Sequence, residues 1–212
     1  MNLMQKPSPT SVVWIRTGLV AGLSGCLIYP SIIFLRLPKA ALVVLAAAIG
    51  PLLAVTSLGL GKLLQLPRPS VSAQLAMMFN FAAGVLVSAM LLVQLAIKAR
   101  LQGAKASPEI VGIWLGLDVA FDVYVGLGTG LFALSMLRHP RFGRVFGGIG
   151  LIIAALLLGL NLFTFPTPPA DAGLFDLGPI VGLWYLVVLL QAWRSMRWAH
   201  SIASARAEEI HP

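Results

Sequence analysis

Two acidic residues lie deep inside one of the apolar stretches of this chain. Asp118 and Asp122 are four residues apart within residues 110–137, a stretch long enough to cross a lipid bilayer. A charged side chain at the bilayer centre costs at least roughly 2.5 kcal/mol, so such residues need a partner or a function. On a helix this spacing places both side chains on nearly one face. The pair is therefore the best candidate for chemistry.

The chemistry expected of this pair is the exchange of a proton or a small cation. Two neighbouring carboxyl groups in an apolar environment should not both be ionised, because burial disfavours each charge and the first charge disfavours the second. We expect one shared proton or two neutral groups. A proton-coupled carrier or a cation sensor needs such a site. The alternative is structural: protonated Asp side chains hydrogen-bond to neighbouring helices and hold them together.

Other polar side chains inside the apolar stretches are candidates to complete this site. They are Gln94, Asn161, Tyr185, Thr129 and Asn80. Counting 1.5 Å per residue, Gln94, Asn161 and Tyr185 come to middle or outer depths, near the pair. Thr129 falls on nearly the same helix face as Asp118, and Asn80 falls below the midplane. We expect Asn161, Gln94 and Tyr185 to assist the pair.

Membrane-spanning helices must position these residues. Hydrophobic residues make up 58% of the 212-residue chain and charged residues only 10%, with a mean hydropathy of +0.92. A soluble domain of this size needs more charge on its surface. The predicted fold is an all-α polytopic membrane bundle of six transmembrane helices in residues 1–193, followed by a short basic and aromatic tail, 194–212. The predicted spans are 12–35, 38–64, 70–97, 108–137, 144–165 and 177–193.

Several predicted helices begin with capping chemistry. Ser107 precedes Pro108 and Glu109, which supplies an N-cap, a proline at the first helical position and an acid near the positive end of the helix dipole. Ser70 is placed to cap the third span and Asp176 the sixth. Glu109 and Asp176 are therefore interpreted as capping residues, whereas Asp118 and Asp122 have no such role.

The basic residues predict the orientation in the membrane. The formal net charge is +8, but the fifteen Lys and Arg residues lie almost wholly at span ends and in short connections, which indicates anionic lipid headgroups and not nucleic acid. Ten of them fall on the side of the N-terminus, against five on the other side: Lys6, Arg16, Lys62, Arg68, Arg138, Arg141, Arg144, Arg194, Arg197 and Arg206, against Arg36, Lys39, Lys98, Arg100 and Lys105. This bias predicts that both termini are cytoplasmic.

Cofactor and catalytic motifs do not emerge from the sequence. Cys26 is the only cysteine, so one chain cannot form a disulfide or a thiolate metal site. The histidines, His139, His200 and His211, lie outside the predicted spans, which excludes a bis-histidine haem within the membrane. We expect no cofactor, no metal and no catalytic residue.

Small residues and one proline predict how the helices pack. Glycines four residues apart permit close helix approach, and we expect contacts within the chain at Gly18 and Gly22, Gly112 and Gly116, Gly126 and Gly130, Gly143 and Gly147, and Gly178 and Gly182. Pro51 follows Gly50 in the middle of the second span, where a kink or a broken backbone hydrogen bond is expected.

The segment around the Asp pair resembles a family of bacterial proteins. The residues Asp118-Val-Ala-Phe-Asp122-Val-Tyr-Val-Gly126-Leu-Gly-Thr-Gly130, followed by Arg138-His-Pro-Arg-Phe-Gly143 and a glycine-rich span, are similar to uncharacterised bacterial multi-span membrane proteins of the domain-of-unknown-function type. The resemblance covers about residues 112–165. It implies a bacterial inner-membrane protein and carries no activity or cofactor.

Three functions follow, in order of preference. The first is a small transport or sensing protein of the inner membrane with a proton- or cation-responsive Asp pair. The second is a non-catalytic structural or accessory subunit of a larger membrane complex. The third, a lipid-modifying membrane enzyme, lacks an identifiable nucleophile, base or metal site. The expected partners are the lipid bilayer and other membrane subunits.

Overall fold

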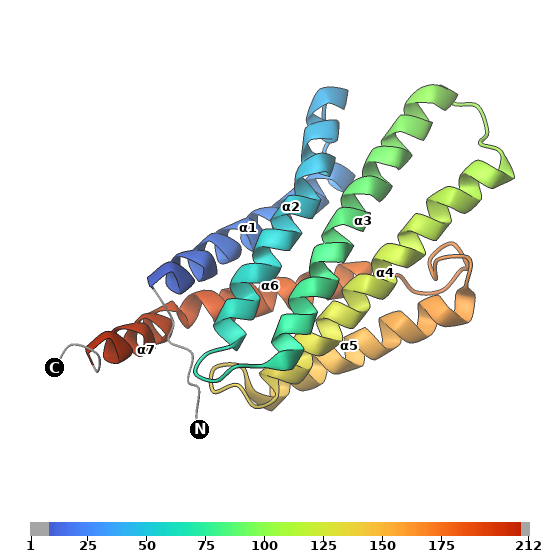
Figure 1. The fold of residues 1–212 in the computed structure, drawn as a ribbon. Helices are drawn as coiled ribbons and strands as arrows, with labels where there is room; N and C mark the ends of the chain where they lie inside the picture. The colour runs from blue at the N-terminus through green and yellow to red at the C-terminus, as the bar shows by residue number, and fades with distance from the viewer. Residues whose placement is uncertain (1–8, 209–212) are drawn as a thin grey trace.

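The apolar stretches form helices joined by short connections (Figure 1). The computed structural model describes residues 9–208, and within them the surroundings of the side chains of 12–32 and 34–202. This part of the chain is all-helical: α1 Pro9–Phe34, α2 Lys39–Leu64, α3 Val71–Leu101, α4 Pro108–Met136, α5 Gly143–Thr164, α6 Gly178–Arg194 and α7 Met196–Glu208. Lys6 and residues 209–212, which include His211, lie outside the described residues.

The number of possible membrane spans is five or six. Helices α1 to α5 are each long and apolar enough to cross a membrane, and their bounds agree with the predicted spans to within a few residues. The predicted sixth span corresponds to α6, which has 17 residues. At 1.5 Å per residue, it covers about 25 Å, less than a bilayer core of about 30 Å. With α7 it forms a pair bent by 49° that passes as one broken span.

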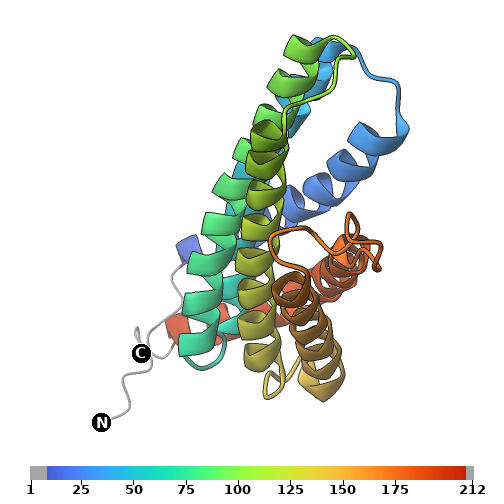
Figure 2. The same cartoon turned by 90° about the vertical axis from the view of Figure 1, so that its right-hand side faces the viewer.

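The helices pack in chain order and α6 closes the arrangement. Each of α1 to α5 packs along the next one, and α6 contacts α1, α2 and α5 (Figures 1 and 2). The buried residues of α6 recur every three or four positions and form one face toward the bundle: Val181, Trp184, Tyr185, Val188, Leu189 and Ala192. This face carries Tyr185 into the interior.

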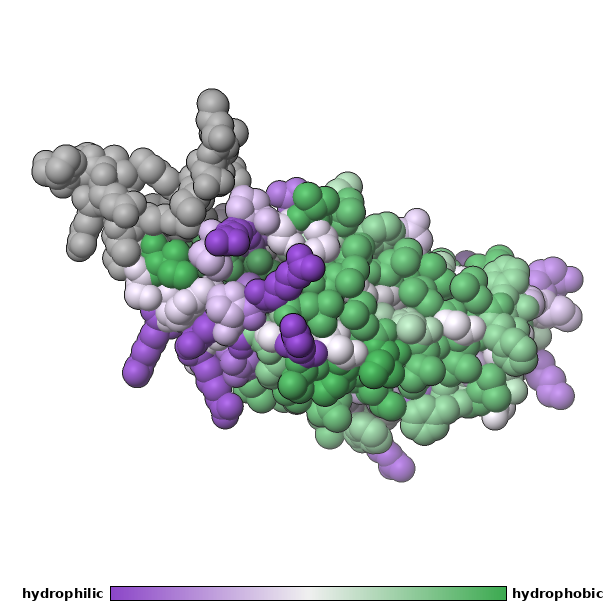
Figure 3. Space-filling model, turned by 90° about the horizontal axis from the view of Figure 1, so that it is seen from below, coloured by the Kyte–Doolittle hydropathy of each residue, from purple (hydrophilic) through white to green (hydrophobic). Residues whose placement is uncertain are grey.

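An apolar band surrounds the bundle between two hydrophilic ends (Figure 3). Large side chains within the band are almost fully exposed, for example Phe34 at 80% and Phe163 at 82%. Such a continuous apolar surface is the outside of a protein whose solvent is lipid. The apolar helices and this band indicate a multi-pass membrane protein.

Close packing at glycine is found for only some of the predicted pairs. A side chain at Gly18 would meet the backbone of Gly59, and one at Gly147 would meet the carbonyl of Ala133. The prediction also holds for Gly22, Gly126 and Gly130, which contact neighbouring helices. It is wrong for Gly112, Gly116, Gly143 and Gly182, which face open space within the described residues, and Gly178 meets only Asp176.

Pro51 breaks the backbone ladder of α2 as expected, and α3 compensates for the break. Proline has no N–H, so the carbonyl of Ala47 loses its usual donor four residues later. The hydroxyl of Ser88 in α3 donates to this carbonyl at 3.2 Å and accepts from the N–H of Gly50 at 3.0 Å. Gly84 allows the close approach, because its backbone meets that of Gly50. The disrupted segment thus becomes a contact between α2 and α3.

Two of the three predicted caps make the expected hydrogen bond. Ser70 accepts from the N–H of Ala73 at 3.2 Å, and Asp176 accepts from the N–H of Gly178 at 2.8 Å. Ser107 occupies the N-cap of α4 with Pro108 behind it, but its side chain makes no capping bond. Asp176 therefore has a local structural role at the start of α6.

Candidate functional site

The connection between α5 and α6 determines the surroundings of the Asp pair. Helix α5 has 22 residues, against 31 in α3 and 29 in α4. Because α5 is shorter, the following connection lies beside the middle of α4 and not level with its far end (Figures 1 and 2). Asp118 and Asp122 are the residues of α4 in this region, and both side chains are half-buried.

Asp122 is hydrogen-bonded to a buried amide of α5. The Nδ2 group of Asn161 donates to Oδ2 of Asp122 at 3.0 Å and to the carbonyl of Leu157 at 3.0 Å. Asn161 has no exposed surface. Its Oδ1 atom has no hydrogen-bond partner within the described residues. An unpaired buried acceptor costs about 1–3 kcal/mol, so this corner of the site retains capacity for one more donor.

Further acidic residues surround the pair. Asp118 lies within electrostatic range of Asp171 and Asp176 from the α5–α6 connection, and Asp122 lies within range of Asp118 and Asp176. Tyr29, near the end of α1, is within range of Asp176 and both members of the pair. Within the described residues none of these acids forms an ion pair with Lys or Arg. The site therefore concentrates negative charge and favours a positive ligand.

Asn80, Thr129 and Tyr185 form a separate polar cluster. The hydroxyl of Tyr185 donates to Oδ1 of Asn80 at 2.9 Å and accepts from the hydroxyl of Thr129 at 3.2 Å. Asn80 also donates to the carbonyl of Ala76 at 2.9 Å. A side chain at Gly128 would overlap the Asn80 amide, so the glycine leaves the room that this amide occupies. The cluster joins α3, α4 and α6.

This cluster is distant from the Asp pair along α4. Thr129 follows Asp122 by seven residues, which corresponds to about 10 Å at 1.5 Å per residue. The expectation that Tyr185 assists the pair is therefore not met, because the hydroxyl is engaged at the level of Thr129. Its hydrogen bonds are satisfied inside the cluster, which is typical of a structural contact between membrane helices.

Gln94 lies level with the pair but is not bonded to it. The ammonium of Lys98 in α3 lies 5.1 Å from the ring of Trp114 in α4. Because the helices are antiparallel, the residues one turn further along, Gln94 and Asp118, lie at the same level. Gln94 is half-buried and makes no hydrogen bond within the described residues.

The sequence did not reveal three members of this region: Tyr29, Asp171 and Asp176 as neighbours of the pair. Counting residues along the first span would have placed Tyr29 near its outer end, at a depth comparable with the pair. Asp171 and Asp176 carried no such signal, because the shortness of α5 that lowers their connection becomes meaningful only once the helices are packed.

Comparisons and ligand geometry add no identity to the site. Among the described residues, no group of three or more His, Cys, Asp or Glu side chains could hold a metal ion. The chain matches no protein-family model, no curated protein and no solved structure.

Proposed function

We propose that this protein is a small transport or sensing protein in which Asp118 and Asp122 bind and release a proton or a small cation. The observation that carries the proposal is the placement of Asp122. Its carboxyl group lies within a candidate span, accepts from the buried Asn161 amide, and has acidic neighbours where a structural ion pair would have a base. Acids inside membrane spans commonly mark ion and proton pathways.

Neutralisation of the carboxyl group would change the contact between α4 and α5. A hydrogen bond to a charged acceptor contributes about 1.5–3 kcal/mol, against about 0.5–1.5 kcal/mol for a neutral one. Binding of a proton or cation at Asp122 therefore weakens the bond from Asn161. It also allows the Asn161 amide to turn, so that Oδ1 accepts from a protonated carboxyl. The link gives ligand binding a route to helix movement.

The test is the protonation of these acids in purified protein reconstituted in lipid. Infrared difference spectra of the carboxyl C=O stretch should show a band that titrates with pH and shifts on addition of a transported or sensed ion. The D122N variant should remove that band, and D118N should move its midpoint. D171N is a matched control, because it removes an acid of the same cluster that lies outside the span. A carboxyl band that stays protonated and unresponsive to pH and ions would refute the proposal.

The membrane and orientation belong to the same proposal. We place the protein in a bacterial inner membrane with six spans, the sixth being the bent α6–α7 pair, and with both termini in the cytoplasm. The support is the resemblance around residues 112–165 and the bias of basic residues toward the end of the bundle that carries the connections at Arg68 and Arg138. Reporter fusions at each connection test it, and an external C-terminus would overturn the orientation.

A second function, an accessory subunit of a membrane complex, is favoured by one feature of α4. Gly112 and Gly116 have open space where side chains would be, and Ile113 beside them is 60% exposed. Small residues on a lipid-facing surface permit close approach of another helix. Purification in a mild detergent tests this function: a stoichiometric partner lost in the G112L/G116L variant supports it, and an unchanged monomer counts against it.

A further inference from the structure

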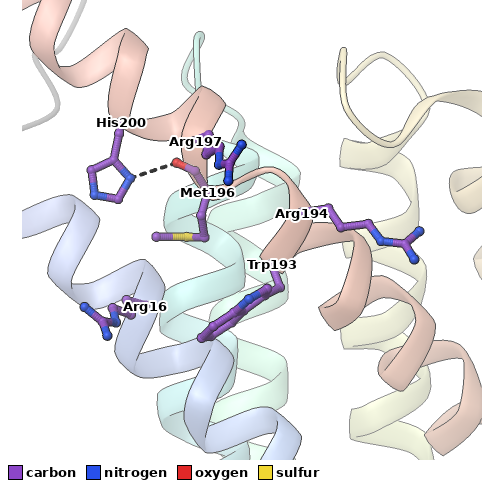
Figure 4. Close-up of a pocket in the computed structure, with 6 residues that line it drawn as sticks. All are labelled: Arg16, Trp193, Arg194, Met196, Arg197 and His200. Atoms are coloured by element: carbon purple, nitrogen blue, oxygen red, sulfur yellow. Dashed lines mark hydrogen bonds between the residues drawn. The ribbon is translucent and has the colours of Figure 1, made fainter.

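A basic pocket lies at the end of the bundle that carries α7, far along the chain from the Asp pair. It has a volume of about 540 Å³ and is lined by Arg16, Trp193, Arg194, Met196, Arg197 and His200 (Figure 4). Arg16 comes from α1, whereas the other residues come from the end of α6 and the start of α7. The 49° bend between α6 and α7 separates their axes and leaves this hollow against α1.

The pocket concentrates positive charge that the chain does not neutralise. Arg16, Arg194 and Arg197 are all exposed, and within the described residues none of them forms a hydrogen bond or an ion pair from its side chain. The described lining includes no acidic residue. Arginine carries planar donors that match phosphate oxygens, and it stays charged at any physiological pH. Three such groups around one hollow suit a phosphate anion.

The surroundings of the pocket indicate that the phosphate belongs to a lipid. Trp193 in the lining and Trp14 on α1 are each about half exposed, as expected of tryptophans at the boundary between headgroups and acyl chains. One turn further into the apolar band, Val20 on α1 and Leu190 on α6 are also exposed. The basic hollow therefore continues into an apolar surface between α1 and α6, where acyl chains would lie.

We propose that this pocket binds the phosphate headgroup of an anionic phospholipid, with its acyl chains along α1 and α6. Arg16, Arg194 and Arg197 hold the phosphate, and Trp193 lies against the glycerol region. The site does not depend on the Asp pair, and it applies to a transporter and to an accessory subunit alike. It also gives the bent α6–α7 segment a defined position at the membrane surface.

The test uses the full chain in nanodiscs and lipids with brominated acyl chains, which quench nearby tryptophans. Brominated phosphatidylglycerol should quench the protein more than brominated phosphatidylcholine at the same mole fraction. The W193F variant should lose most of this excess, because Trp193 is the reporter inside the pocket. Each Arg→Gln change should weaken the preference about fivefold, since a basic residue near an anionic surface contributes about 1 kcal/mol.

A matched triple variant separates the pocket from general electrostatic attraction. R16Q/R194Q/R197Q removes the pocket charges, and R68Q/R138Q/R144Q removes the same number of exposed arginines from the same end of the bundle. The proposal requires loss of the preference in the first variant only. An equal loss in both, or no preference for phosphatidylglycerol in the unmodified protein, would overturn it.

Two further measurements guard the interpretation. R16K/R194K/R197K keeps the charge and should keep most of the preference, which excludes misfolding as the cause of a loss. Inorganic phosphate at matched ionic strength should leave the quenching excess unchanged. If phosphate in solution abolishes the excess, the site binds free phosphate and the lipid proposal is wrong.

Discussion

Removal of the Tyr185 hydroxyl distinguishes the polar cluster from the Asp pair. The Y185F change keeps the ring, which packs against Trp184 with centroids 5.0 Å apart, and removes two hydrogen bonds. Oδ1 of Asn80 then has no donor at a position with no exposed surface. An orphaned buried acceptor costs about 1–3 kcal/mol, but hydrogen bonds between membrane helices average about 0.6 kcal/mol with a maximum of about 1.7. We expect a loss of stability of about 1–2 kcal/mol.

The assay is unfolding in mixed micelles by increasing SDS, followed by far-UV circular dichroism. A double-mutant cycle with N80A isolates the contact, and its coupling energy should be about 1 kcal/mol. Y124F is the matched control, because Tyr124 is also a tyrosine of the bundle but is 39% exposed toward lipid. This control should change stability by less than about 0.5 kcal/mol.

The infrared titration of the carboxyl groups decides whether the cluster also belongs to the functional site. Because Tyr185 is bonded at the level of Thr129 and not at Asp122, Y185F should leave the carboxyl band of the pair unchanged. A Y185F variant that is fully stable but lacks the titrating band would refute this reasoning, since it would make the cluster and the pair one site.

Three further predictions concern packing and pH. Burial lowers the pKa of His139, which lies in the connection between α4 and α5; the unfolded chain therefore binds a proton near its ordinary pKa of about 6.5 that the folded protein does not, and stability should fall as the pH drops below that value. The H139Q variant should reduce this slope in unfolding measured between pH 5 and 8, and an unchanged slope would contradict the assignment (the pH range follows the ordinary titration range of about 5–8 for histidine). S88A should destabilise the protein by about 1 kcal/mol in the same SDS assay, because the Ala47 carbonyl and the Gly50 N–H lose their partner, whereas S31A removes only a bond within α1 and should have little effect. G59L should prevent close packing of α1 on α2, because the backbones of Gly18 and Gly59 are in contact, and G116L should leave the isolated chain folded because nothing occupies that space; size-exclusion profiles in detergent check both, and a misfolded G116L monomer would show that the open face packs within the chain.

The sequence by itself determined the helices and the most unusual residues. Hydropathy over about 20 residues is a local property, so the bounds of α1 to α5 were predicted to within a few residues. Capping is also local, which is why Ser70 and Asp176 were identified correctly. The Asp pair was evident because the cost of a buried carboxyl depends on its apolar surroundings in the chain. The six-span count, the orientation and the function of the pair stay predictions.

Only the tertiary structure decided which polar groups meet. Counting residues gives the depth of a side chain along its helix, but each residue turns it by about 100°, and the packing of neighbouring helices selects the face that is buried. Asn161 therefore meets Asp122, whereas Tyr185 meets Asn80 and Thr129. The same rotation leaves Gly112 and Gly116 facing open space. The basic pocket depends on a bend between α6 and α7, which brings arginines from opposite ends of the chain to one hollow.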